Sequence, residues 1–156
     1  MRTVVIGSGS WGIALAQVLQ DNHQEVLVYG VAEAEVNDIN ENHKNSKYFG
    51  DVELNPELKA TTDIQCIKGA DIVLLAVPTI AIDPICHQIN DILDKKTIII
   101  NVSKGFHPET NERMSEVIRR CIDEDKLSSV VSLIGPSHAE EVVIRLLTTI
   151  DAISLN

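Results

Sequence analysis

The sequence predicts a single α/β domain, residues 1–156, with a doubly wound and mostly parallel sheet. Strand-like apolar runs alternate with segments of helical period along the chain, and no linker or internal repeat divides it. Strand, helix and strand in repeated succession imply parallel strands joined by right-handed crossovers. A chain of 156 residues that is 44% hydrophobic and 23% charged has the composition of a globular domain with one substantial core.

In the first half of the chain, a β-rich run over residues 3–6 leads into a glycine-rich turn. Residues 11–19 are apolar almost all round, which predicts a helix covered on both sides. Residues 25–29 are expected to form a second strand. Ala32, Val36 and Ile39 then mark one face of the next helix.

In the second half, residues 71–77 form an apolar run that ends at a proline, which is typical of a strand buried on both faces. A helix is expected to follow, with Pro84 in its first turn, where proline is tolerated. The remaining predicted elements are a strand over 97–100, an amphipathic helix over 114–122, a strand over 130–134, a helix starting near Ser137 and a last strand within 148–155.

The chain is strongly acidic, with 13 Lys and Arg against 23 Asp and Glu and a formal charge of −10. A field of that sign repels nucleic acid and anionic membranes, so we expect neither as a partner. No apolar run approaches the roughly 18 residues of a membrane span, and no signal-peptide pattern opens the sequence, which predicts a cytoplasmic protein. Any phosphate site must be built locally, from backbone N–H groups, helix N-termini and a well-placed lysine.

Metal chemistry is not indicated by the sequence. Cys66, Cys86 and Cys121 lie far apart and are expected to be buried, reduced thiols. The five histidines show no H-E-x-x-H or other ligand spacing, so we expect no metal site.

The turn after the first strand reads Gly7-x-Gly9-x-x-Gly12, between a β-run and an apolar helix. In that context the first glycine makes the turn, the second lets the backbone approach a pyrophosphate, and the third lets helix and strand pack closely. The pattern predicts a Rossmann-type dinucleotide site, with Ser10 and Trp11 beside the phosphate path. The alternative is a tight turn without a ligand.

The end of the second strand bears on the choice of dinucleotide. An acid that binds the ribose is expected about 20 residues past the fingerprint, and Glu33 is the nearest one. A solvated glutamate at a helix start explains Glu33 equally well. No arginine stands there to hold a 2′-phosphate, which favours NAD over NADP.

Two further positions follow predicted strands, where ligands of parallel sheets bind. Lys104 comes after the strand at 97–100 and could meet a phosphate or a polarised carbonyl, although a surface lysine before Gly105 fits as well. Ser137-x-x-Glu140 has the pattern of a capping box, whose helix N-terminus could also receive an anion.

A series of motifs stands in order along residues 1 to about 150. These are GSGSWG at 7–12, Ile39-Asn40-x-x-His43-x-Asn45-x-x-Tyr48, Val77-Pro78-Thr79, Ser103-Lys104-Gly105 and GPSHAEE at 135–141. Together they resemble those of bacterial NAD(P)-dependent glycerol-3-phosphate dehydrogenases. The resemblance implies reduction of dihydroxyacetone phosphate to sn-glycerol 3-phosphate with NAD or NADP, as a step toward phospholipids.

Site residues follow from the resemblance by motif. On the cofactor side it implies Gly7, Gly9, Ser10, Trp11, Gly12, Tyr48, Pro78, Lys104 and Ala139. The phosphorylated substrate would be held by Lys104, Gly135 and Ser137.

The family also has a helical C-terminal domain that supplies the proton-transfer lysine, and the resemblance implies that this chain is the cofactor domain alone. We therefore expect no catalytic residue within it and little turnover, because a positioned acid–base group contributes about 10²–10⁴-fold. The apolar residues within 142–147 and 150–155 would face the second domain, and their exposure favours self-association.

Two other functions remain open on sequence grounds. One is a non-catalytic module that senses NAD. The other is a domain of a related hydroxyacid or ketopantoate-type reductase, against which the GPSHAEE segment argues.

Overall fold

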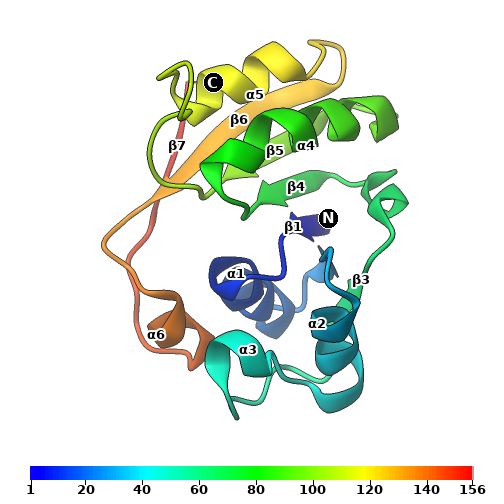
Figure 1. Cartoon of the computed structure of the whole chain (residues 1–156), viewed down its shortest axis with the longest axis vertical. Coiled ribbons are helices and arrows are strands. Elements are labelled where there is room, and N and C mark those ends of the chain that lie inside the picture. The colour runs from blue at the N-terminus through cyan, green and yellow to red at the C-terminus, as the bar shows by residue number, and fades with distance from the viewer. Residues whose placement is uncertain (156) are drawn as a thin grey trace.

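The computed structural model describes residues 1–155, which form a seven-stranded sheet between two layers of helices (Figure 1). The spatial order of the strands is β3-β2-β1-β4-β5-β6-β7. Their bounds are β1 (Arg2–Ile6), β2 (Glu25–Tyr29), β3 (Lys59–Thr61), β4 (Ile72–Leu75), β5 (Thr97–Asn101), β6 (Leu127–Ile134) and β7 (Asp151–Ser154). All neighbours pair in parallel except β6 and β7, which are antiparallel. The predicted doubly wound, mostly parallel architecture is confirmed.

Helices cover both faces of the sheet. They are α1 (Ser10–Asp21), α2 (Glu33–Asn37), α3 (Ser46–Phe49), α4 (Thr79–Ile92), α5 (Met114–Cys121) and α6 (Ala139–Val143), with a π-helical turn at Asp38–Asn42 and a 3₁₀ turn at Ile64–Ile67. Figure 1 shows α4 and α5 on one side of the sheet and α1, α2 and α6 on the other. None of the helices within residues 1–155 is both long and apolar enough to cross a bilayer.

The central strand β1 shows how the sequence builds two cores. Val4 and Ile6 pack with α4 and α5, whereas Val5 packs with α1 on the opposite face. All three side chains are fully or almost fully buried. Successive strand residues point to opposite faces, so an uninterrupted apolar strand has both faces covered by helices.

Three details differ from the sequence-based expectations. Helix α4 begins at Thr79, so Pro84 lies in its second turn instead of its first. Helix α6 has five residues and follows His138, with no side chain capping it, so the predicted capping box of Ser137 and Glu140 does not form. The short elements β3 and α3 were not expected, because three or four residues show too little periodicity to be recognised.

The cysteines are free, as predicted. Cys86 and Cys121 are buried and Cys66 is half-buried. Burial raises the pKa of Cys66 to about 11 and that of Cys86 to about 12, because a thiolate is poorly solvated inside the protein. Both groups are therefore protonated thiols at neutral pH.

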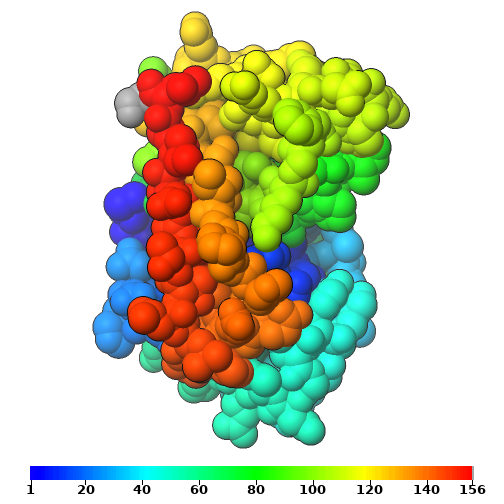
Figure 2. Space-filling model, turned by 90° about the vertical axis from the view of Figure 1, so that its left-hand side faces the viewer, coloured from blue at the N-terminus to red at the C-terminus, as the bar shows by residue number. Residues whose placement is uncertain are grey.

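The C-terminal segment runs along the edge of the molecule, with β7 beside β6 (Figure 2). Val142 and Val143 are buried against the α1 side of the core, so the expectation that residues 142–147 form an uncovered apolar tail is wrong for them. Leu146 and Leu147 are exposed, and so is every residue of β7. The exposed apolar surface is therefore smaller than the sequence suggested and lies at the sheet edge.

Candidate functional site

A hollow of about 410 Å³ opens where the carboxyl ends of β1, β4 and β5 meet. Six of the residues predicted for the cofactor line it: Gly9, Ser10, Trp11, Tyr48, Pro78 and Lys104. In Figure 2 the dark blue start of the chain is visible between cyan residues and the yellow-green segment after β5. The hollow therefore lies at the edge of a parallel sheet where ligands of this architecture bind.

The three glycines of the turn have different roles. A Cβ added at Gly7 would overlap the carbonyl oxygen of Ala76, and Gly7 has a φ of +117° that side-chain-bearing residues rarely adopt. A Cβ at Gly12 would overlap the carbonyl oxygen of Gly7. At Gly9 a Cβ would meet no atom within 4 Å. Gly7 and Gly12 thus serve packing, whereas Gly9 leaves an open approach to the backbone.

The open approach at Gly9 leads to the N-terminus of α1. The first hydrogen bond within this helix is donated by the Ile13 N–H to the Gly9 carbonyl oxygen, at 3.0 Å. The N–H groups of Ser10, Trp11 and Gly12 precede that bond and have no acceptor within the helix. The first turn carries no acidic side chain, so the positive end of the helix dipole is not neutralised there. These features fit a pyrophosphate.

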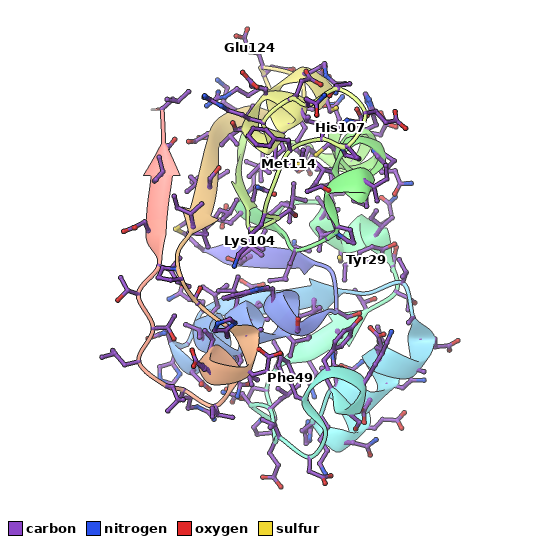
Figure 3. All side chains as sticks on the ribbon, turned by 60° about the vertical axis from the view of Figure 1, so that its left-hand side comes forward. Tyr29, Phe49, Lys104, His107, Met114 and Glu124 are labelled. Carbon is purple, nitrogen blue, oxygen red and sulfur yellow. The ribbon has the colours of Figure 1, made fainter. Side chains whose placement is uncertain are left out.

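Lys104 supplies a cation to the same hollow. Its Nζ lies 5.8 Å from the centroid of the Trp11 ring, and no carboxylate within residues 1–155 lies within ion-pair distance of it. The loop is held by Ser103, whose Oγ donates a hydrogen bond to the Val77 carbonyl oxygen and whose N–H donates to Asn101 Oδ1 at 3.2 Å. Figure 3 shows Lys104 on the loop that follows β5. Its ammonium is available to an anion.

Asn45 is hydrogen-bonded to the backbone of the glycine-rich turn. It was not singled out from the sequence as a site residue. Its side chain is 1% exposed, and its Nδ2 donates a hydrogen bond to the Ser8 carbonyl oxygen at 2.7 Å. Three residues later, Tyr48 lies in the wall of the hollow. The motif that contains both was noticed only through the resemblance, because spacing alone does not show that it packs on residues 7–12.

Glu35, which was not singled out from the sequence, is an acid that contacts the glycine-rich turn. Its carboxylate accepts hydrogen bonds from Ser8 Oγ at 2.5 Å and from Lys47 Nζ at 2.6 Å. Burial acts to raise the pKa of Glu35, but the hydrogen bonds and the charge of Lys47 outweigh it and hold this pKa below its ordinary value. The ionised Glu35 therefore braces the turn at neutral pH.

This brace predicts a loss of stability in acid. A carboxyl whose pKa is lower in the folded state stabilises that state above its unfolded pKa, and the contribution disappears as the pH falls through the folded pKa. We expect Glu35→Gln to lower stability at pH 7 and to reduce the drop in stability on going below about pH 4. Urea unfolding at a series of pH values measures both effects, with Glu33→Gln as the matched control. An unchanged pH dependence in Glu35→Gln would contradict the interpretation.

Gly135 and Ser137, which the resemblance implies on the substrate side together with Lys104, do not line this hollow, and neither does Ala139. A Cβ at Gly135 would lie 2.8 Å from the Thr149 carbonyl oxygen. Ser137 is 6% exposed, with its N–H bonded to the Gly135 carbonyl oxygen at 3.1 Å. Ala139 belongs to the buried cluster that includes residues of α1. Their assignment to substrate or cofactor remains a prediction.

Comparisons with known proteins identify the family of the chain. Residues 2–156 match the family described as NAD-dependent glycerol-3-phosphate dehydrogenase N-terminus. The glycerol-3-phosphate dehydrogenase [NAD(P)+] of Listeria monocytogenes serotype 4b (strain CLIP80459) is 48% identical over 152 residues, which are 97% of this chain and 45% of that protein. The chain thus spans a little under half the length of the curated relatives it matches.

Solved structures give the same picture. The glycerol-3-phosphate dehydrogenase of Coxiella burnetii aligns with a TM-score of 0.89 and 27% identity, over 99% of this chain and 47% of that one. A ketopantoate reductase from Ralstonia eutropha aligns over 86% of this chain and 41% of that one, with a TM-score of 0.66 and 18% identity, which shows a shared fold alone. The chain therefore belongs to the NAD-dependent glycerol-3-phosphate dehydrogenase family and corresponds to its N-terminal part.

Proposed function

We propose that residues 1–156 are the cofactor-binding half of an enzyme that reduces dihydroxyacetone phosphate to sn-glycerol 3-phosphate in the cytoplasm, for phospholipid synthesis. The observation that carries the proposal is the hollow in which the open face of Gly9, the N-terminus of α1 and Lys104 meet. The relatives are named as glycerol-3-phosphate dehydrogenases, and the curated one as NAD(P)-dependent, which supports the proposed choice of substrate.

The chain's own residues bind and orient. The N–H groups at the start of α1 hold the pyrophosphate of the dinucleotide, and Gly9 lets it approach them. Lys104 attracts the negative charge of cofactor and substrate, and the resemblance adds Gly135 and Ser137 on the substrate side. The bound nicotinamide supplies a hydride. By the same resemblance the proton comes from a lysine outside these residues, so we expect the chain alone to turn over slowly.

We propose that NAD is preferred over NADP. The carboxylate of Glu35 lies against the glycine-rich turn, on the side of α2, and a negative charge there disfavours a 2′-phosphate. Lys47 is already paired with that carboxylate, at 2.6 Å, and is therefore not a free cation for the phosphate.

Titration of the 156-residue chain with NADH and with NADPH tests the proposal, with nicotinamide fluorescence as the measure of binding. We expect NADH to bind more tightly than NADPH and Glu35→Gln to narrow the difference. Failure of a folded chain to bind either dinucleotide would refute the cofactor site. Dihydroxyacetone phosphate reduction at a rate typical of an enzyme would instead refute the expectation of slow turnover.

Self-association is the expected result of the apolar surface along the C-terminal segment. Leu147 is fully exposed, and a groove of about 590 Å³ lies between α1 and residues 142–150, lined by Val18, Leu146 and Ile150 among others. Uncovered apolar surface favours association. Sedimentation velocity over a range of concentrations should show dimers or larger species, and Leu147→Glu should reduce their fraction. Leu19→Glu is not a suitable control, because Leu19 packs on the core. A monomer at every concentration would contradict this proposal.

A further inference from the structure

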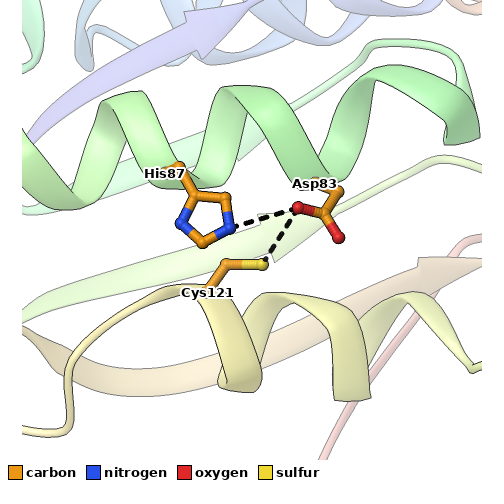
Figure 4. Close-up of side chains that lie close together, drawn as sticks. All are labelled: Asp83, His87 and Cys121. Carbon is orange, nitrogen blue, oxygen red and sulfur yellow. Dashed lines mark hydrogen bonds and ion pairs between the residues drawn. The ribbon is translucent and has the colours of Figure 1, made fainter.

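Three potential ligand atoms of different chemistry meet on the face of the molecule opposite α1. Asp83 Oδ1 lies 3.2 Å from His87 Nε2 and 3.7 Å from Cys121 Sγ, as the close-up in Figure 4 shows. A ligand atom from each of the three residues lies within 4.8 Å of the others. The carboxylate lies between the imidazole and the thiol.

The cluster depends on helix packing. Asp83 and His87 are four residues apart in α4, so their side chains share one face of that helix. Cys121 is the last residue of α5, which packs against α4. Cys121 is buried, whereas the side chain of His87 is 61% exposed. Packing therefore holds the Cys121 side chain in place, whereas the His87 side chain is free to change its rotamer.

We propose that Asp83, His87 and Cys121 form a binding site for a borderline-soft divalent cation of the Zn²⁺ class. Zinc bonds of about 2.3 Å to sulfur and about 2.0–2.2 Å to nitrogen and oxygen place tetrahedral ligands roughly 3.3–3.6 Å apart. The measured separations of 3.2 and 3.7 Å lie close to this range. The remaining separation, between imidazole and thiol, closes by rotation of the exposed His87 side chain.

Groups around the cluster hold the carboxylate for this role. Arg120 Nη2 donates to Asp83 Oδ2 at 2.9 Å, which leaves Oδ1 facing His87 and Cys121. The same nitrogen donates to Glu112 Oε2 at 3.1 Å, and that carboxylate balances the charge of the guanidinium. Such outer partners orient the ligands of metal sites.

The access of solvent to the cluster and the charges of its ligands also suit a divalent cation. Asp83 and His87 line an open hollow of about 630 Å³, from which a water molecule can take the fourth coordination position. A divalent cation with one carboxylate and one thiolate is electrically neutral. Binding releases the thiol proton to solvent, so the step is a ligand exchange in which nothing is oxidised or reduced.

A nucleophilic cysteine is the competing interpretation of the same residues. In a Cys–His pair the imidazole must reach the thiol to take its proton. Here the imidazole contacts Asp83, and the thiol contacts Asp83 and Arg120 Nη1, each at 3.7 Å, while Cys121 is only 4% exposed. The geometry therefore favours a shared ligand over an activated thiol. From the sequence we expected no metal site, because Asp83 and His87 are four residues apart and Cys121 lies 34 residues beyond His87.

Cobalt(II) tests the proposal, because it adopts zinc geometries and absorbs visible light. We expect the untagged 156-residue chain to bind one equivalent, with a sulfur-to-cobalt charge-transfer band and the visible bands of tetrahedral cobalt, and Zn²⁺ to displace it. His87→Gln, at an exposed position, should weaken binding by roughly 10–100-fold or more, because loss of an outer partner alone costs that much. The matched control His23→Gln, also at an exposed residue, should bind as the parent chain does.

Two cysteine variants separate the sulfur ligand from other thiols. Cys121→Ser should abolish the charge-transfer band, and Cys66→Ser should leave it unchanged. Circular dichroism of each variant establishes that it is folded, and His87→Gln keeps the test valid where Cys121→Ser fails to fold. No cobalt spectrum with a folded parent chain, or a spectrum that His87→Gln leaves unaltered, would overturn the proposal. No dinucleotide is involved, so this result is independent of the proposed function.

Discussion

Alanine in place of Gly12 is expected to lower the free energy of unfolding by about 2 kcal/mol, whereas alanine in place of Gly9 should leave it nearly unchanged. The new methyl group at position 12 would overlap the Gly7 carbonyl oxygen, which belongs to the backbone and cannot rotate away. Overpacking costs about 1–3 kcal/mol, and more where backbone must shift. The gain in helix propensity, about 1 kcal/mol, recovers only part of that cost.

The same pair of variants should behave in the opposite way toward ligand when both are folded. At Gly9 the methyl group points into space that is open in the structure, and in our proposal the pyrophosphate enters there. We expect Gly9→Ala to weaken NADH binding by about 10-fold, which corresponds to about 1.4 kcal/mol. Urea unfolding gives the stabilities and fluorescence titration gives the affinities. Equal destabilisation by the two substitutions, or unaltered NADH binding by Gly9→Ala, would show that the roles of the glycines are misassigned.

The contrast between the glycines also shows what local sequence can predict. The strand before Gly7, the apolar helix after Gly12 and the alternation of buried contacts along β1 all follow from periodicity, which depends only on near neighbours. The turn between them was predicted correctly because the φ of Gly7 and the close packing at Gly7 and Gly12 restrict these two positions to glycine. Features of this kind need no knowledge of distant segments.

Other parts of the site depend on contacts that periodicity cannot encode. Asn45 binds the carbonyl of Ser8 across 37 residues, and Glu35, which was not considered from the sequence, accepts a hydrogen bond from Ser8 Oγ across 27 residues. Similarly, Cys121 joins Asp83 only because α5 packs on α4. Each case involves a polar side chain whose partner is chosen by tertiary packing, which local propensity does not determine.

The placement of α6 is a failure of a different kind. Ser137 and Glu140 have the residue types of a capping box, yet the helix starts one residue later than the pattern requires and has only five residues. Its position is set by burial of Val142 and Val143 on the α1 face, so tertiary packing overrode the cap.

Replacement of Lys104 by glutamine is expected to weaken NADH binding by about 10–100-fold, because a hydrogen bond to a charged group contributes roughly 1.5–3 kcal/mol. The side chain lines the hollow beside Trp11, and no carboxylate within residues 1–155 pairs with it, so its charge is not already neutralised. Glutamine keeps most of the length and removes only the charge. Stability should change little, since Lys104 is exposed.

Lys96→Gln is the matched control for this prediction. Lys96 is also exposed and precedes β5, whereas Lys104 follows it, and either substitution changes the formal charge from −10 to −11. If the overall acidic field governed binding, both variants would lose affinity equally. If a local cation offsets that field, only Lys104→Gln will lose affinity, and the loss will shrink as added salt screens the interaction. Titrations of the two variants at low and high salt therefore distinguish a built anion site from a general effect of net charge.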